Sequence, residues 1–398
     1  MDSYVVIGGG LAGLTAANAL AGNGNKVTLL EQSQHFGGRA QTQQQHGYFM
    51  NLGPHALYCG GVAMQTFREW NIPFSGNFPP QSGRNYLVRE NKLYPAVHDV
   101  RSLMTTRLFS VREKFEAVRL FSLFTGGRSS EGETMRQWVD RHARSERVRE
   151  FAATITRIAT YTTDLEHLSA KAALEQLSLA IKHNVWYLDG GWQTLIDGLL
   201  NRAISLGVEI CHEHVVTMDA LKADGIVLAV GPASVEKLTG IPVPRQRPLR
   251  MASLNIGLRK LSTEAAHVAF GLDRPLYFSV HSESVRLAPE GKALAHVAKY
   301  LGDSQPDPNA VREELEDYAS LVMPQWQREA EVVRFLPNLT VTPMMAVPEG
   351  RPDVDFLGLE NITVAGDWVG TEGMLADAAV ASALKAVSVI QQRKLQVA

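Results

Sequence analysis

The N-terminal stretch combines a short apolar run, a helical pattern and a second apolar run. Residues 4–7 are apolar throughout and rich in β-branched side chains, which is typical of a strand buried on both faces of a parallel sheet. A glycine-rich turn follows at residues 8–13, and residues 11–21 predict a helix. Residues 26–30 predict a second strand. The chain therefore begins with the strand, turn, helix and strand of an α/β unit.

Later segments carry the same pattern and supply the strands that the N-terminal pair lacks. The expected strands are 208–210, 215–216, 225–230 and 362–365, and the expected helices are 192–206 and 374–390. The run at 225–230 is too continuously apolar for a half-exposed strand. These elements predict a doubly wound parallel sheet of the Rossmann type, assembled from both ends of the chain.

Two long insertions separate these sheet segments and are expected to form a second, α+β domain. The predicted nucleotide-binding domain comprises 1–60, 188–240 and 346–398, and the predicted substrate-binding domain comprises 61–187 and 241–345. The first insertion is mainly helical in pattern, and the second contains strand-like runs. The expected helices are 111–124, 134–153 and 170–182, and the expected strands are 252–258, 276–281 and 293–300.

Composition narrows the class of protein. A chain of 398 residues with 45% hydrophobic and 20% charged residues has the profile of a globular enzyme. A net charge of −2 without a basic stripe argues against nucleic-acid binding. Cys59 and Cys211 are the only two cysteines, too few for a disulfide framework, which favours a reducing, cytoplasmic location.

The N-terminal glycines have the spacing of a phosphate-binding turn. Gly8 permits the tight turn, Gly10 lets a pyrophosphate approach the backbone, and Gly13 lets the helix pack on the strand. The helix N-terminus, including Leu11 and Ala12, adds partial positive charge. Glu31, followed by Gln32, ends the second strand, where an acidic side chain can accept hydrogen bonds from both hydroxyls of an adenosine ribose. This unit alone leaves NAD and FAD open.

Two further motifs distinguish between the cofactors. His35-Phe36-Gly37-Gly38-Arg39-Ala40 and Asn51-Leu52-Gly53-Pro54-His55 follow the turn. With them the chain resembles the flavin amine oxidase superfamily, which includes protoporphyrinogen oxidases and phytoene-type desaturases. The resemblance implies non-covalently bound FAD. It places Arg39, between Gly38 and Ala40, against the cofactor's phosphates and flavin end, and it places Gly53, Pro54 and His55 beside the isoalloxazine.

The C-terminal half carries the rest of the resemblance. It implies that Asp367, within Gly366-Asp367-Trp368, accepts hydrogen bonds from the ribityl and pyrophosphate region. It also implies that the last helix aims its N-terminus at the flavin N1/C2 edge, where Ala378 stands in place of a common glycine. The remaining residues that the resemblance assigns to cofactor binding are Val216, Ala229, Ala376 and Ala379.

The expected chemistry is hydride transfer from a substrate carbon to flavin N5. Amine oxidases of the superfamily carry a lysine near N5, but residues 250–254 contain none, so His55 and Lys299 are the catalytic candidates. Trp368 has no tyrosine partner for an aromatic cage. These features favour desaturase-like oxidation of a largely apolar substrate, with oxygen or another acceptor reoxidising the flavin. An amine or amino-acid oxidase and a non-catalytic flavin-carrying subunit are the alternatives.

Two other segments have competing interpretations. Residues 103–124 form a basic amphipathic stretch, which could contact a membrane surface or pack against the protein's own core. His212 and His214 share one face of an expected strand, but no further metal ligands have suitable spacing. We therefore expect a polar surface strand and no metal site.

Overall fold

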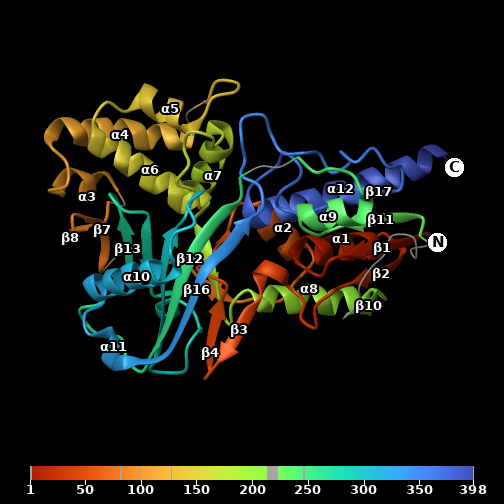
Figure 1. Ribbon diagram of the computed structural model, residues 1–398, viewed down its shortest axis with the longest axis horizontal. Coiled ribbons are helices and arrows are strands. Elements are labelled where there is room, and N and C mark those ends of the chain that lie inside the picture. Colours follow the sequence, from red (N-terminus) through yellow and green to blue (C-terminus); the bar gives the residue numbers. More distant parts are fainter. Residues whose placement is uncertain are drawn as a thin grey trace.

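Within the part of the chain that the structure describes, five parallel strands from distant segments form the first sheet (Figure 1). The computed structural model describes residues 2–80, 83–97, 99–126, 128–212, 223–244 and 247–397. The strands are β1 (Ser3–Ile7), β2 (Lys26–Leu30), β10 (Glu209–Cys211), β11 (Gly225–Leu228) and β17 (Ile362–Val364). Their order is β10-β2-β1-β11-β17, with all four pairings parallel. The predicted Rossmann-type α/β fold is therefore confirmed.

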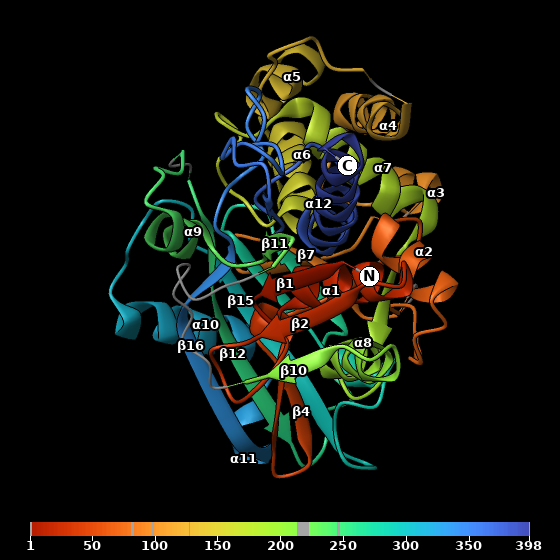
Figure 2. The ribbon, with the colours of Figure 1, turned by 90° about the vertical axis from the view of Figure 1, so that its right-hand side faces the viewer.

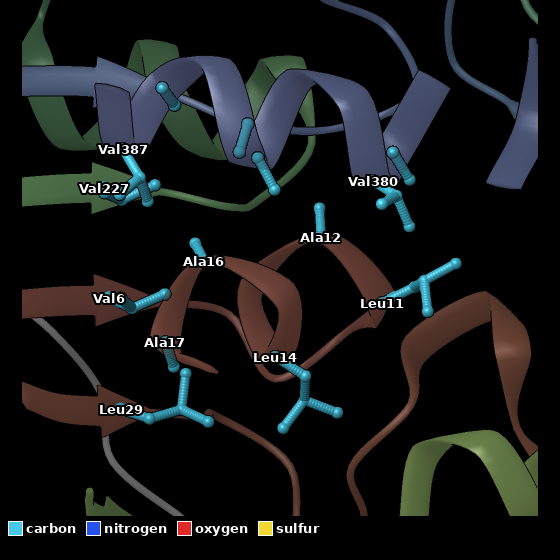
Figure 3. Packing of buried hydrophobic residues seen from close by; sticks show 14 of the residues in the cluster. Val6, Leu11, Ala12, Leu14, Ala16, Ala17, Leu29, Val227, Val380 and Val387 are labelled. Atoms are coloured by element: carbon cyan, nitrogen blue, oxygen red, sulfur yellow. The ribbon is translucent and has the colours of Figure 1, made fainter. Parts of the chain in front are cut away.

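Helices α1 (Leu11–Gly22), α8 (Gln193–Ser205) and α12 (Leu375–Val397) pack beside this sheet. Helix α1 contacts both of the others and lies between them (Figure 2). Ala12 and Ala16 point from α1 towards α12, and such small side chains allow the two helices to approach closely (Figure 3). Leu11 and Val380 lie at the same end of this layer, so α1 and α12 begin on the same side (Figure 3).

The second sheet has seven strands in the order β16-β12-β15-β14-β13-β7-β8. It contains β7 (Asn85–Arg89), β8 (Lys92–Pro95), β12 (Leu249–Leu258), β13 (Val268–Gly271), β14 (Leu276–Ser279), β15 (Ala293–Tyr300) and β16 (Ala330–Thr342). All pairings are antiparallel except the one between β13 and β7. Helix α10 (Pro308–Val322) packs on one face of this sheet, and the short helix α11 (Trp326–Glu329) precedes β16.

A helical group lies above the second sheet in Figure 1. It contains α3 (Val100–Thr105), α4 (Val111–Gly126), α5 (Met135–His142), α6 (Glu146–Thr160) and α7 (Ala170–His183). The single helix predicted over 134–153 is wrong, because α5 and α6 are separate. The Glu116 carboxylate accepts hydrogen bonds from the backbone amides of Arg144 and Ser145, which stabilises the break between them.

Helix α4, within residues 103–124, has both buried and exposed apolar side chains. Leu120 and Phe124 are buried in the helical core, whereas Val111 and Phe115 are 68% and 64% exposed. No helix of the described residues is long and apolar enough to cross a membrane.

The remaining elements connect the two sheets. They are α2 (Val62–Glu69), α9 (Pro232–Thr239), and the short strands β3 (Thr42–Gln45), β4 (Tyr48–Asn51), β5 (Leu57–Tyr58), β6 (Gly76–Asn77) and β9 (Val185–Leu188). The expected strand 215–216, with Val216, and residue His214 lie outside the described residues.

Candidate functional site

The glycine turn after β1 is tightly packed on one side and open on the other. A Cβ on Gly13 would lie 1.7 Å from the Gly8 carbonyl oxygen, and one on Gly8 would lie 2.4 Å from the Ala229 oxygen. Gly8 also has a φ of +109°, which favours glycine. A Cβ on Gly10 would meet only the Gly37 oxygen, at 3.9 Å. Packing therefore requires glycine at positions 8 and 13, while Gly10 leaves free space above the backbone.

Glu31 lies beside this turn. Its carboxylate accepts hydrogen bonds from the Gly9 amide at 2.6 Å and the Ser33 amide at 2.7 Å. These bonds hold the carboxylate at the end of β2, whereas the side chain of Gln32 is exposed. Leu11 and Ala12 form the buried first turn of α1. The position of Glu31 suits contact with a ribose that extends from the turn.

The 37–40 segment lies against the turn. The Gly37 amide donates to the Gly9 oxygen at 2.8 Å, and a Cβ on Gly38 would lie 3.6 Å from Gly10 Cα. Ala40 is buried, which leaves Arg39 as the polar side chain of this short 3-10 helix. The structure thus brings the two glycine motifs together.

Arg39 forms an ion pair with Asp367. The guanidinium donates to the two carboxylate oxygens at 2.5 and 2.7 Å, and also to the Val341 carbonyl at 2.5 Å. Burial alone would lower the pKa of Arg39, but Asp367 outweighs it and the pKa lies above its ordinary value. The Arg39 side chain is 46% exposed and that of Asp367 only 6%. The guanidinium therefore stays accessible to a bound anion while it is paired.

Arg351 was missed by the sequence analysis. Its guanidinium donates to the carbonyl oxygens of Asp367 at 2.8 Å, Gly370 at 2.9 Å and Gly373 at 2.8 Å. These bonds tie the loop between β17 and α12 to the half-buried guanidinium of Arg351. In the sequence, Arg351 is a single arginine outside every predicted element, so no pattern indicated its role. Ser382 fixes the other end of the loop, because its hydroxyl accepts from the Gly366 amide at 2.9 Å.

The 53–55 turn forms another wall of the site. His55 Nδ1 lies 2.9 Å from the Gly53 oxygen, and its ring centroid lies 5.3 Å from that of Trp192. Burial lowers the pKa of His55, and hydrogen bonds to backbone groups only partly oppose this effect. The imidazole is therefore neutral at neutral pH. Tyr161, at the end of α6, donates its hydroxyl to the Pro54 oxygen at 3.1 Å.

Asn51 begins the 51–55 motif and holds the start of this turn, a role that the sequence did not assign to it. Its side-chain oxygen accepts from the Thr42 hydroxyl at 2.6 Å and from the Trp192 amide at 3.1 Å. Its backbone oxygen accepts from Arg334. The sequence alone could not indicate this role, because the partners of Asn51 come from three other parts of the chain.

The N-terminus of α12 completes the site. Ala376 is partly buried, and Ala378 and Ala379 are buried. Asp377 accepts a hydrogen bond from the Ala63 amide at 2.9 Å, and burial raises its pKa to about 6. Leu375 begins the helix with a φ of +55°, a strained value for a non-glycine residue. The helix start is thus fixed by specific contacts.

Two predicted site residues lie elsewhere than expected. Lys299 is ion-paired with Glu314 of α10, on the sheet face that packs against that helix. Its neighbour Tyr300 points to the opposite face, so we do not retain Lys299 as a catalytic candidate. The Trp368 side chain is 1% exposed, and its indole N–H donates to the Val230 oxygen at 3.0 Å. The ring therefore belongs to the core.

These features fit an anionic dinucleotide. Gly10 leaves its backbone open, α1 and α12 begin on the same side, and Arg39 adds an accessible cation. The chain matches the family model described as FAD dependent oxidoreductase over residues 3–385. The protein belongs to the FAD-dependent oxidoreductases. It is therefore an enzyme with FAD as its cofactor, as the sequence predicted.

Curated relatives include L-amino acid oxidases from snakes. One from Crotalus durissus cumanensis is 49% identical over 86 residues, which is 21% of this chain and 17% of the relative. One from Pseudechis australis is 53% identical over 55 residues, 13% of this chain and 11% of the relative. The matched stretch thus spans well under two thirds of these relatives' length.

Solved structures share the fold over nearly the whole chain. An oxidoreductase from Methanosarcina mazei has a TM-score of 0.75, 17% identity and coverage of 97% of this chain and 100% of that one. Putrescine oxidase bound to putrescine has a TM-score of 0.69 and 14% identity, and the match covers 98% of this chain and 99% of that one. Cyclohexylamine oxidase from Brevibacterium oxydans has a TM-score of 0.70 and 13% identity, and the match covers 99% of each chain. At these identities the comparison shows a shared fold, and the expected likeness to the flavin amine oxidase superfamily is confirmed at that level.

Proposed function

We propose that the oxidoreductase oxidises a small organic substrate by removing a hydride from carbon, in a chamber next to the 53–55 turn. Bound FAD supplies the hydride acceptor. The protein's own residues orient the substrate C–H bond and exclude water. The single observation that carries this proposal is a buried aromatic cluster that meets the 53–55 turn.

This aromatic cluster contains Tyr161, Tyr277, Tyr300 and Met251. The rings of Tyr161 and Tyr300 lie 6.0 Å apart. A Cβ on Gly53 would lie 3.3 Å from the Met251 sulfur, so the cluster reaches the turn directly. Burial raises the pKa of each of the three tyrosines, which keeps the phenols neutral. Neutral aromatic walls with a few hydroxyls suit a largely apolar substrate.

Oxidation of a C–C bond is the preferred reaction. Residues 250–254 contain no lysine, and Lys299 faces α10. The buried indole of Trp368 supplies no cage for an amine. We also propose that 1–60, 188–240 and 346–398 bind FAD through the residues placed above, and that 61–187 and 241–345 bind the substrate. Oxygen or another acceptor would complete turnover.

An amine or amino-acid oxidase is the second candidate. The similarity to L-amino acid oxidases over 86 residues favours it. A non-catalytic flavin carrier is not retained, because the chain belongs to an oxidoreductase family.

Anaerobic flavin bleaching tests the proposal. The purified holoenzyme is mixed with candidate hydrocarbons, carbonyl compounds and amines, the visible absorbance is followed, and the oxidised product is identified by mass. Bleaching with a new C=C product supports the first candidate. Bleaching by amines, with peroxide released in air, supports the second and overturns the first.

Peripheral membrane contact through 103–124 is a further part of the proposal. Exposed Val111 and Phe115 lie beside Arg112 and Lys114, a combination that suits anionic lipid surfaces. Cosedimentation with phosphatidylglycerol vesicles tests it. Binding should be lost in Phe115→Asp, and equal binding by wild type and variant would contradict the assignment.

A further inference from the structure

The two faces of the seven-stranded sheet differ in chemistry. On the face under α10, β12 and β15 carry Ala252, Leu254, Ile256, Ala295 and Val297. On the opposite face, the strand register places polar groups side by side. These groups are Ser253, Asn255, Tyr277, Ser279, His296 and Tyr300, and we call them the chamber face. All six are buried. Burying so many polar groups on one sheet face is unfavourable unless they find hydrogen-bond partners.

A relay across three strands fixes part of this face. Arg334 of β16 can only donate, so the Asn255 amide oxygen faces it and accepts from Nε at 3.2 Å and from the terminal nitrogen at 2.8 Å. The Asn255 amide nitrogen then donates to His296 Nδ1 at 2.7 Å. His296 Nδ1 is therefore an acceptor. A neutral imidazole that accepts at Nδ1 carries its proton on Nε2.

His296 is held in the neutral form. Burial lowers the pKa of His296 to about 3, and the positive charge of Arg334 adds to the effect. Its side chain is 0% exposed, and Nε2 has no hydrogen-bond partner among the described residues. His281 Nδ1, in the same part of the structure, also has no hydrogen-bond partner among the described residues. An N–H donor and one further polar atom therefore remain unsatisfied in one place.

These unsatisfied atoms lie close to the 53–55 turn. The His281 ring stacks on Tyr187 with centroids 3.8 Å apart and meets the His296 ring at 4.8 Å. Arg334 links this face to the turn, because its guanidinium donates both to the Asn255 amide oxygen and to the backbone oxygen of Asn51, two residues before Gly53. The unsatisfied atoms thus adjoin the proposed substrate chamber.

We propose that His296 presents a fixed Nε2–H donor to a carbonyl oxygen of the substrate, and that Arg334 and Asn255 position this donor. The inference rests on the proposed function and narrows its substrate class to molecules with a carbonyl oxygen near the oxidised carbon. Asn255 and Arg334 act through His296 and are positioning residues. No proton is transferred in this recognition, since His296 donates a hydrogen bond and stays neutral.

The tautomer of His296 is the first test. The holoenzyme is labelled with 15N-histidine, and the His296 ring signals are assigned by their loss in His296→Phe. We expect a protonated Nε2 and an unprotonated Nδ1 at neutral pH. Asn255→Leu removes the donor to Nδ1 and should release the tautomer into a mixture. The proposal is overturned if His296 of the wild type carries its proton on Nδ1 or is an imidazolium. It is also overturned if His296 keeps a single Nε2–H tautomer in Asn255→Leu.

Ligand discrimination is the second test. Acetophenone has a carbonyl oxygen, and α-methylstyrene has the same shape without it. Their dissociation constants are measured from flavin difference spectra of the holoenzyme. We expect acetophenone to bind about tenfold more tightly, as one hydrogen bond predicts.

This preference should disappear in His296→Phe and in Asn255→Leu. It should persist in the control His142→Phe, because the His142 ring lies against Trp138, outside the chamber. Equal binding of the two probes to wild type, or an unchanged preference in both chamber variants, overturns the proposal. Neither test requires turnover. Failure of the proposed function would therefore appear separately, as an absence of flavin bleaching by every substrate.

Discussion

Arg39 and Asp367 are joined by two hydrogen bonds although they lie 328 positions apart in the chain. Arg39 belongs to the segment after β2, and Asp367 to the loop between β17 and α12. Their contact links the first and last parts of the nucleotide-binding sheet. It also fixes an accessible guanidinium on the segment whose Gly38 lies against Gly10, where we expect a pyrophosphate to bind.

Breaking this pair should weaken FAD binding. In Asp367→Ala, Arg39 loses its charged partner and its fixed orientation. Charge-assisted hydrogen bonds contribute about 1.5–3 kcal/mol, so the dissociation constant for FAD should rise about 10- to 100-fold. Titration of apoprotein with FAD, followed by flavin fluorescence, measures the change. Asp353→Asn, which alters an exposed pair with Lys385, is the control and should bind as wild type does.

Two glycines in the same turn should respond differently to alanine. Gly13→Ala would place its Cβ 1.7 Å from the Gly8 oxygen, so the protein should unfold at lower denaturant concentration. Gly10→Ala has 3.9 Å of clearance and should fold normally, yet lose FAD affinity. Urea unfolding and FAD titration of both variants provide the comparison. Normal FAD binding by Gly10→Ala would mean that no ligand approaches this backbone.

Asp377 should make stability depend on pH. Its pKa is raised to about 6 from 3.8, so the folded state retains the proton after the unfolded state has lost it. The protonated Asp377 carboxyl group contributes fully to the free energy of unfolding below pH 3.8, the ordinary pKa, and this contribution is lost as the pH rises through about 6. Asp377→Asn keeps the acceptor for Ala63 and removes the charge. Urea unfolding should show it more stable than wild type by about 3 kcal/mol near pH 8 and nearly equal near pH 4. Equal stability at both pH values would contradict the buried carboxylate.

Lys299 should be dispensable for catalysis. Its ammonium pairs with Glu314 and lies on the sheet face away from Tyr300. Lys299→Met should therefore leave the rate of flavin reduction within about twofold of wild type and cost less than about 1 kcal/mol of stability. Stopped-flow absorbance with an active substrate measures the rate. A large fall in reduction rate at normal stability would restore Lys299 to the catalytic site.

Local patterns explain which parts of the fold the sequence predicts. Gly8, Gly10 and Gly13 specify their turn within a few residues, and β15 appears as a strand-like run at residues 293–300 that is apolar except for His296 and Lys299. Strand β16 is missed because Glu331, Arg334 and Pro337 interrupt its apolar pattern, and its register shifts against β12. Such a strand is defined by its neighbours more than by its own residues.

Contacts between distant segments explain what the sequence could not give for the site. The face on which Lys299 lies follows from the pairing of β15 with β12 and β14, and a shift of one residue would reverse it. Arg351 acts through carbonyl groups of a distant loop. The relay from Arg334 through Asn255 to His296 joins three strands whose order is not local.

We expect the protein to bind the dinucleotide half of FAD where α1 and α12 begin. Calorimetric titration of apoprotein with FAD and with riboflavin, which lacks the pyrophosphate and adenosine, tests this placement. We expect one FAD per chain and riboflavin binding weaker by at least about 100-fold. Equal affinity for riboflavin and FAD would contradict this placement.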